Sequence, residues 1–124
     1  MIWLAVGAGG GLGAIMRFWL AAVLQPQGAL VNWGIFGVNV LGGLLMGIIV
    51  ELGALKLDLS PDMRAFLTTG VLGGFTTFSA FSLDSALLLQ KGEYGLAALY
   101  VIGSVVLSIA ALFAGLWLVR ALYA

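Results

Sequence analysis

Gly70-Val-Leu-Gly-Gly-Phe-Thr-Thr-Phe-Ser-Ala-Phe-Ser82 is the stretch that decides the fold. It lies in a segment, from about residue 62 to 89, that is long and apolar enough to enter a bilayer. Each glycine of the central pair costs about 1 kcal/mol in a helix interior relative to alanine, and the two threonines that follow compete for backbone hydrogen bonds. We therefore predict a helix that is broken between Gly73 and Thr77.

A broken helix at membrane depth has a restricted set of uses. Its unwound backbone is tolerated only where it is buried in protein or lines a watery or ionic cavity. The break frees carbonyl groups on one side, which suit a cation, and N–H groups on the other, which suit an anion. Broken membrane helices build ion sites in transporters. The stretch therefore predicts an ion site.

The composition is that of an integral membrane protein. The 124 residues are 63% hydrophobic and 8% charged, with a mean hydropathy of +1.20, and they include no cysteine or histidine. We find no nucleophile–base pair and no metal cluster, so we expect no enzyme. Five basic and five acidic residues give no polybasic patch for nucleic acid. We expect one all-α transmembrane domain, residues 1–124, with four helices over about 2–24, 31–55, 62–89 and 94–123.

The first span combines close-packing glycines with a charge. Gly7 and Gly11, like Gly9 and Gly13, have the small-xxx-small spacing that lets two membrane helices approach closely. Arg17 lies a turn or two inside the apolar run, where a charge is costly. It either snorkels to the interface or lies in an aqueous vestibule that attracts anions.

The second span has a polar residue on a glycine face. Asn39, Gly43 and Gly47 recur every four residues and so share one side of the helix. The glycines predict a close contact with another helix. The Asn39 amide is either an interhelical hydrogen-bonding group or an N–H donor to an ion, and the spacing does not decide between them.

A hydroxyl stripe marks the fourth span. Tyr100, Ser104 and Ser108 also recur every four residues on an otherwise apolar helix. A serine in a membrane helix often bonds the carbonyl four residues before it, which is the ordinary interpretation. The other interpretation is a polar track that replaces the hydration water of an ion.

Two phenylalanines and an acid follow the predicted break. Either Thr77 or Ser79 can cap the new helix, and Phe78 and Phe81 then lie on one face. Such residues most often face lipid or pack, but their positive ring edges can also face an anion. Asp84, one turn further, is expected near the interface or in a vestibule, and its role is open.

The charges hardly distinguish the two sides of the membrane. Four spans place both termini on one side, together with Lys56, Arg64 and Arg120, and leave Lys91 and Arg17 on the other. So small an asymmetry gives almost no positive-inside signal. Two copies can then insert in opposite directions and pair, which makes an inverted repeat from two chains.

Together these residues resemble the Fluc (CrcB-type) family of small fluoride ion channels, over essentially the whole chain. Gly9 to Phe18, with its glycines, Gly-Ala, arginine and aromatic residue, is similar to the family's first span. Asn39-Val-Leu-Gly-Gly43 resembles its second span, and the stretch from Gly70 to Ser82 is similar to its broken third span. Departures are Ala80, Asp84 and Leu72, where the family often has threonine, glutamate, and a smaller or polar residue.

The resemblance implies an antiparallel, dual-topology homodimer in the cell's inner membrane, with two pores that passively export fluoride and lower its toxicity. It implies that the pore residues are Asn39, Phe78, Phe81, Tyr100, Ser104 and Ser108, with Arg17 in the vestibule. It also implies a structural Na⁺ at the dimer interface, held by the backbone carbonyls of Gly73 and Thr76 from both chains. Such hard oxygen ligands suit a hard cation.

Two other functions fit parts of the sequence. A small proton-coupled multidrug-resistance-type exporter needs a carboxylate within the membrane, and Asp84 is the only acid expected well inside a span. A scaffold subunit explains the glycines, but it does not explain why a break occurs together with Asn39 and a hydroxyl stripe. No titratable residue lies at the expected pore centre, which favours a channel over coupled transport.

Overall fold

A computed structural model describes residues 1–123, and every secondary-structure element in this range is a helix. The elements are α1 (Ile2–Leu24), α2 (Trp33–Leu55), α3 (Pro61–Arg64), the π-helix η1 (Ala65–Leu72), α4 (Gly73–Phe75), α5 (Phe78–Gln90) and α6 (Tyr94–Tyr123). Because α3 to α5 form one interrupted span, four helices are long and apolar enough to cross a membrane. The predicted all-α, four-span fold with a broken third helix is confirmed.

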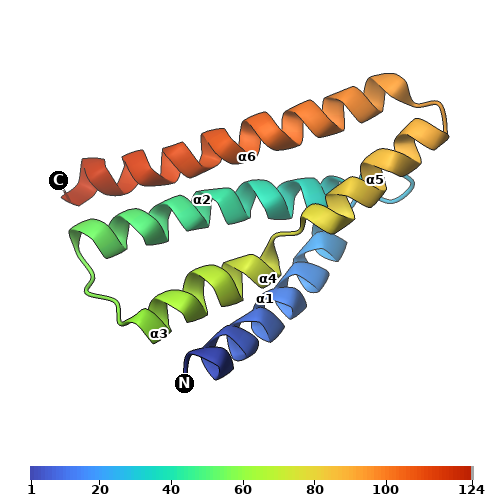
Figure 1. Cartoon of the computed structure of the whole chain (residues 1–124). Coiled ribbons are helices and arrows are strands. Elements are labelled where there is room, and N and C mark those ends of the chain that lie inside the picture. The colour runs from blue at the N-terminus through green and yellow to red at the C-terminus, as the bar shows by residue number, and fades with distance from the viewer. Residues whose placement is uncertain (124) are drawn as a thin grey trace.

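The helices run back and forth, so both termini lie at one end of the molecule, next to the connection from α2 to α3 (Figure 1). The connections from α1 to α2 and from α5 to α6 lie at the other end. Helices α2 and α6 run side by side for most of their length, and α1 packs along the first part of the third span.

Local sequence explains where the helices start and turn. The Asn32 side chain caps α2 by accepting from the N–H of Ile35 at 3.1 Å. Ser60 caps α3 in the same way, accepting from Met63 N at 3.1 Å, with proline at the first helical position. The turn from α5 to α6 uses Gly92, whose φ of 77° favours glycine.

Glycines form both close helix contacts, as their spacing predicted. On α2, a Cβ added at Gly43 would lie 2.5 Å from the Ser108 carbonyl oxygen of α6, and one at Gly47 would collide with the Leu112 carbonyl. On α1, a Cβ at Gly9 would lie 2.5 Å from the Phe66 carbonyl oxygen of η1. These helices therefore approach backbone to backbone, which larger side chains would prevent.

Not every glycine of α1 has this role. A Cβ at Gly13 would collide with the Val71 carbonyl, whereas Gly7 and Gly11 face open space in the protomer. Of the two glycine pairs singled out in the sequence, Gly9 and Gly13 form the contact with the third span. The face that carries Gly7 and Gly11 is left uncovered by this chain.

The break is shorter than the glycine pair suggested. Only Thr76 (φ −85°, ψ 157°) and Thr77 (φ −151°, ψ 118°) adopt extended backbone, while Gly73 and Gly74 remain helical. Gly74 is needed for space, because a Cβ there would collide with the Gly10 carbonyl of α1. The π-helical turns of η1, which precede the break, have no counterpart in the sequence prediction.

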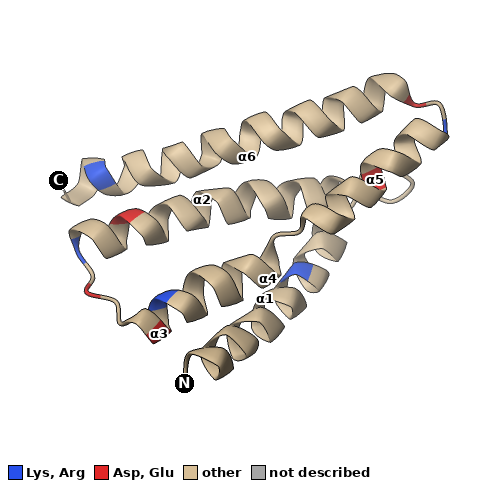
Figure 2. Ribbon diagram, viewed as in Figure 1, with Lys and Arg blue, Asp and Glu red and all other residues tan. Residues whose placement is uncertain are grey.

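Charges are absent from the central parts of α2 and α6 and gather toward the ends (Figure 2). At the end that holds the termini, Arg120 Nη2 contacts Glu51 Oε2 at 3.2 Å, and the terminal amine contacts Asp62 at 3.1 Å. Glu51 lies within α2 and is only 8% exposed, so it is a second acid inside a span. Asp84 is consequently not the only acid within a span.

The glycine contact between α2 and α6 predicts a position-specific cost. We expect Gly47→Ala to lower the free energy of unfolding by about 1–3 kcal/mol, because its methyl group meets backbone atoms that cannot move alone. Gly53→Ala in the same helix is the control, since its Cβ would lie 3.6 Å from a flexible leucine side chain. Unfolding by SDS titration in mixed micelles, followed by circular dichroism, measures both. Equal stabilities would contradict the assignment.

Candidate ion-binding groove at the helix break

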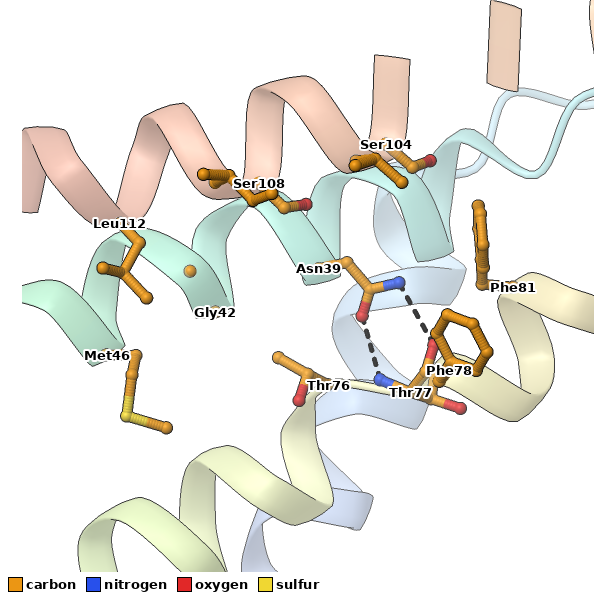
Figure 3. A pocket seen from close by; sticks show the side chains of 13 residues that line it. Asn39, Gly42, Met46, Thr76, Thr77, Phe78, Phe81, Ser104, Ser108 and Leu112 are labelled. Atoms are coloured by element: carbon orange, nitrogen blue, oxygen red, sulfur yellow. Dashed lines mark hydrogen bonds between the residues drawn. The ribbon is translucent and has the colours of Figure 1, made fainter. Parts of the chain in front are cut away.

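A groove of about 430 Å³ lies over the break, between α2, α5 and α6 (Figure 3). Most of its wall is apolar, with a few amide and hydroxyl groups among the hydrocarbon side chains, a pattern typical of small-ligand sites. Its lining residues are Asn39, Gly42, Gly43, Met46, Thr76, Thr77, Phe78, Phe81, Ser104, Val105, Ser108, Ile109 and Leu112. The fold thus gathers five of the six residues named as pore residues, and Tyr100 is the exception.

Asn39 is joined to the break by two hydrogen bonds. Its Nδ2 donates to the Thr77 carbonyl at 3.2 Å, and the Thr77 N–H donates to its Oδ1 at 2.9 Å (Figure 3). The Asn39 oxygen thereby accepts from the Thr77 N–H, which lacks a helical partner at the break. The Asn39 N–H adds a donor to the Thr77 carbonyl, which as the N-cap carbonyl also accepts the first hydrogen bond of α5. Asn39 makes the interhelical bond that was one interpretation of the sequence. Because a primary amide carries two N–H donors, one remains after the bond to Thr77.

The two threonines close the helix ends on either side of the break. Thr76 Oγ1 donates to the Leu72 carbonyl at 2.9 Å, at the end of α4. Thr77 Oγ1 accepts from the Ala80 N–H at 3.1 Å and so caps α5. Of the two caps that the sequence allowed, Thr77 is the one used. Thr76 also fits closely over Gly42, where a Cβ would collide with its methyl group.

Arg17 reaches the break from the opposite side. Its Nε donates to the Gly74 carbonyl at 3.1 Å, and the side chain is partly buried. It does not line the groove in this protomer. The sequence suggested an interfacial or a vestibule arginine, and neither interpretation identified a backbone carbonyl as its partner.

The phenylalanine pair is divided between the core and the surface. Phe81 is 9% exposed and its ring lies 5.4 Å from that of Tyr100, centroid to centroid. Phe78 is 78% exposed, with its ring centroid 5.5 Å from that of Phe81. Phe81 therefore anchors α5 in the protomer, while Phe78 presents its ring at the open groove.

The hydroxyl stripe is divided as well. Ser104 is only 5% exposed, and its Oγ has no hydrogen-bond partner within residues 1–123. The ordinary interpretation, a bond to the carbonyl four residues before, thus does not apply to Ser104. Ser108 lies one turn further along the groove. A buried hydroxyl without a partner is costly, so Ser104 is suited to a polar ligand that enters the groove.

Tyr100 is fully buried outside the groove, where it joins a second polar group. Its hydroxyl donates to Asp84 Oδ2 at 3.1 Å, and the same oxygen accepts from Asn32 Nδ2 at 3.0 Å. Asp84 thereby ties α5 to α2 and α6. The sequence left its role open, and the cap signal at Asn32 gave no indication of this second bond.

The chemistry of the break suits a hard cation. In a continuous helix the carbonyls of Gly73 and Thr76 would accept from the N–H groups of Thr77 and Ala80. Those N–H groups instead donate to Asn39 and to the Thr77 hydroxyl. The two carbonyls are thus available as oxygen ligands. Among residues 1–123 no group of three or more acidic, histidine or cysteine side chains can hold a metal.

Comparison with known proteins gives consistent relatives. The family model described as CrcB-like protein, Camphor Resistance (CrcB), matches residues 4–116. The fluoride-specific ion channel FluC of Rhodopseudomonas palustris (strain BisB5) is 53% identical and covers 98% of this chain and 99% of its own. Those of Agrobacterium fabrum and Rhizobium meliloti are 48% and 49% identical, over 95% and 96% of both chains.

The pairing of Asn39 with Thr77 predicts that the amide stabilises the fold. We expect Asn39→Ala to lower the free energy of unfolding by about 1–3 kcal/mol, because it leaves the Thr77 N–H without an acceptor. Ser104→Ala, in the same groove, should leave it nearly unchanged, because that hydroxyl has no partner to lose. Unfolding by SDS titration compares the two, and an equal loss in both variants would show that the amide pairing is not what matters.

Proposed function

The chain belongs to the CrcB-like family, and on this premise we propose that it is a fluoride-selective ion channel. It is a multi-pass membrane protein by its four apolar helices and its family. The observation that carries the proposal is the groove at the break. Ser104, whose buried hydroxyl has no hydrogen-bond partner among residues 1–123, lines it together with the Asn39 amide and the Phe78 ring. In a cell, passive conduction would let fluoride leave the cytoplasm.

The groove has the chemistry that fluoride requires. Fluoride is small and tightly hydrated, so a pore must replace its water shell with other donors. The hydroxyls of Ser104 and Ser108, the remaining N–H of Asn39 and the positive ring edge of Phe78 are such donors. Because these donors are neutral, each binds the ion only weakly, so fluoride can enter and leave the groove quickly.

The groove also favours passive conduction over proton coupling. None of the residues that line it is titratable. A multidrug-resistance-type exporter would instead need a membrane carboxylate free to exchange protons. Asp84 lies outside the groove lining and accepts from Asn32 and Tyr100, while Glu51 is paired with Arg120. Neither acid has the position that such an exporter needs.

A second copy of the chain completes the pore in this proposal. The groove is open on the protomer, and Phe78 at its edge is 78% exposed. An antiparallel partner would cover this apolar face and bring its own groove, which gives two pores per dimer. The nearly balanced charges at the two ends of the molecule support insertion in both directions.

A structural Na⁺ fits the same arrangement. One protomer offers the carbonyls of Gly73 and Thr76, and Gly73 is exposed on its surface. Two antiparallel copies would supply four such oxygens, a hard ligand set for a hard cation. The ion would hold the two breaks together and compensate their unpaired carbonyls.

Fluoride efflux from liposomes tests the function. With a K⁺ ionophore to balance charge, we expect purified protein to release fluoride rapidly and retain chloride. Phe78→Ile should slow the efflux by up to about tenfold, because a favourable aromatic edge contact contributes roughly 0.5–1.5 kcal/mol. Phe78 is the better target than Phe81, whose ring also holds the core.

The matched control is Phe113→Ile, which changes an exposed ring of α6 that does not line the groove. It should leave efflux unchanged. No fluoride release from folded, dimeric protein would rule out the channel, and equal effects of the two variants would remove Phe78 from the pore.

Ser104 provides a second test of the groove. We expect Ser104→Ala to slow fluoride efflux by roughly tenfold, because one donor worth about 1–2 kcal/mol is lost from the ion's path. Ser82→Ala is the control, since that exposed hydroxyl bonds the Phe78 carbonyl instead and lies outside the groove. Unchanged efflux in Ser104→Ala would mean that this hydroxyl does not meet the ion.

A further inference from the structure

We propose that Arg17 is a positioning residue, which sets the geometry of the break through the Nε–H bond to Gly74. The inference rests on the proposed function, because it concerns how the Na⁺ ligands of that function are held. The observation behind it is the 3.1 Å hydrogen bond from Arg17 Nε to the Gly74 carbonyl. The partly buried Arg17 side chain makes this bond from the first span to the third. A vestibule charge would not need this contact.

The hydrogen bonds of the break show why this carbonyl matters. The break removes the usual donors of four successive carbonyls, those of residues 73 to 76, because a helical carbonyl accepts from the N–H four residues later. Arg17 supplies a donor to Gly74. The carbonyls of Gly73 and Thr76, on either side of it, keep their lone pairs for a cation. Arg17 thus helps to determine which carbonyls of the break remain without a donor and can bind a cation.

The backbone at Gly74 is also one that a hydrogen bond to its carbonyl can hold in place. This position must be glycine because a Cβ there would collide with the Gly10 carbonyl of α1. A glycine without a side chain has the softest backbone, so its peptide plane rotates most easily. The Gly74 carbonyl belongs to the peptide plane that joins Gly74 to Phe75, and this plane lies between the carbonyls of Gly73 and Thr76 along the chain. Holding that plane restricts the separation of the two proposed ligands.

The charge of Arg17 and its hydrogen bond should act in opposite directions on a cation. A guanidinium near the break repels Na⁺, so its charge alone would weaken Na⁺ binding. An ordered Gly74 carbonyl strengthens binding, because the ligands need no rearrangement. The two contributions can therefore be separated by substitutions that keep one and remove the other.

The side-chain chemistry provides that pair. Arg17→Gln keeps an N–H donor at the ε position, where arginine has Nε, and removes the charge. Arg17→Lys keeps the charge but has a methylene at the ε position, with its donor one bond further out. The measurement is thermal unfolding of the purified dimer at increasing Na⁺, with N-methylglucamine to hold the ionic strength constant. It gives the Na⁺ concentration for half-maximal stabilisation.

We expect Arg17→Lys to raise that Na⁺ concentration roughly tenfold, as for the loss of one charged hydrogen bond, and Arg17→Gln to leave it unchanged or lower it. Glu51→Gln, which breaks the ion pair with Arg120, is the control for simple destabilisation. It should lower the melting temperature at every Na⁺ concentration without moving the midpoint.

The reverse order, with Lys like the native protein and Gln impaired, would overturn the proposal in favour of a charge role. No shift in either variant would also overturn it. Amide hydrogen exchange of the segment around residues 72–80 provides a readout that needs neither Na⁺ nor fluoride. Faster exchange in Arg17→Lys than in Arg17→Gln is expected, and equal exchange contradicts the positioning role.

These measurements distinguish a failure of the proposed function from a failure of the positioning role of Arg17. If the native protein shows no Na⁺ dependence, the Na⁺ site is wrong and hydrogen exchange alone decides the role of Arg17. If fluoride efflux is absent while exchange still distinguishes the two variants, the channel assignment fails and the positioning role stands.

Discussion

The structure depends on the reciprocal hydrogen bonds between the Asn39 side chain and the backbone of Thr77. Unpaired N–H and C=O groups are expensive in a membrane interior, and without these bonds a continuous helix would be favoured. The break redirects the chain into α5, which brings Phe78 and Phe81 beside the α6 hydroxyls. One amide thus maintains both the bend and the groove.

Small residues make this arrangement possible. The glycines of α2 bring α6 into backbone contact, so Ser104 and Ser108 line the same groove as Asn39. The glycines of α1 and the third span let Arg17 reach the Gly74 carbonyl. The break is consequently supported from α1 by Arg17 and from α2 by Asn39. The carbonyls of Gly73 and Thr76 are left with free lone pairs.

The sequence predicted the features that repeat locally, and it failed where a partner comes from elsewhere. Four-residue spacing identified the glycine contacts, and glycine with threonine located the break. The same spacing placed Tyr100 with the two serines, but each four-residue step turns about 40° beyond a full turn of the helix, so the stripe drifts around it. Tyr100 faces Asp84 instead, and Glu51 is buried because Arg120 neutralises it. Neither partner is near in sequence.

The reversal potential of the current through purified protein in a planar bilayer tests fluoride selectivity most directly. With a tenfold fluoride gradient and equal chloride on both sides, a passive fluoride-selective pore reverses about 59 mV from zero, toward the fluoride equilibrium potential. A pH gradient imposed at constant fluoride should not move it. A reversal near zero, or one that follows the proton gradient, would contradict a selective passive channel.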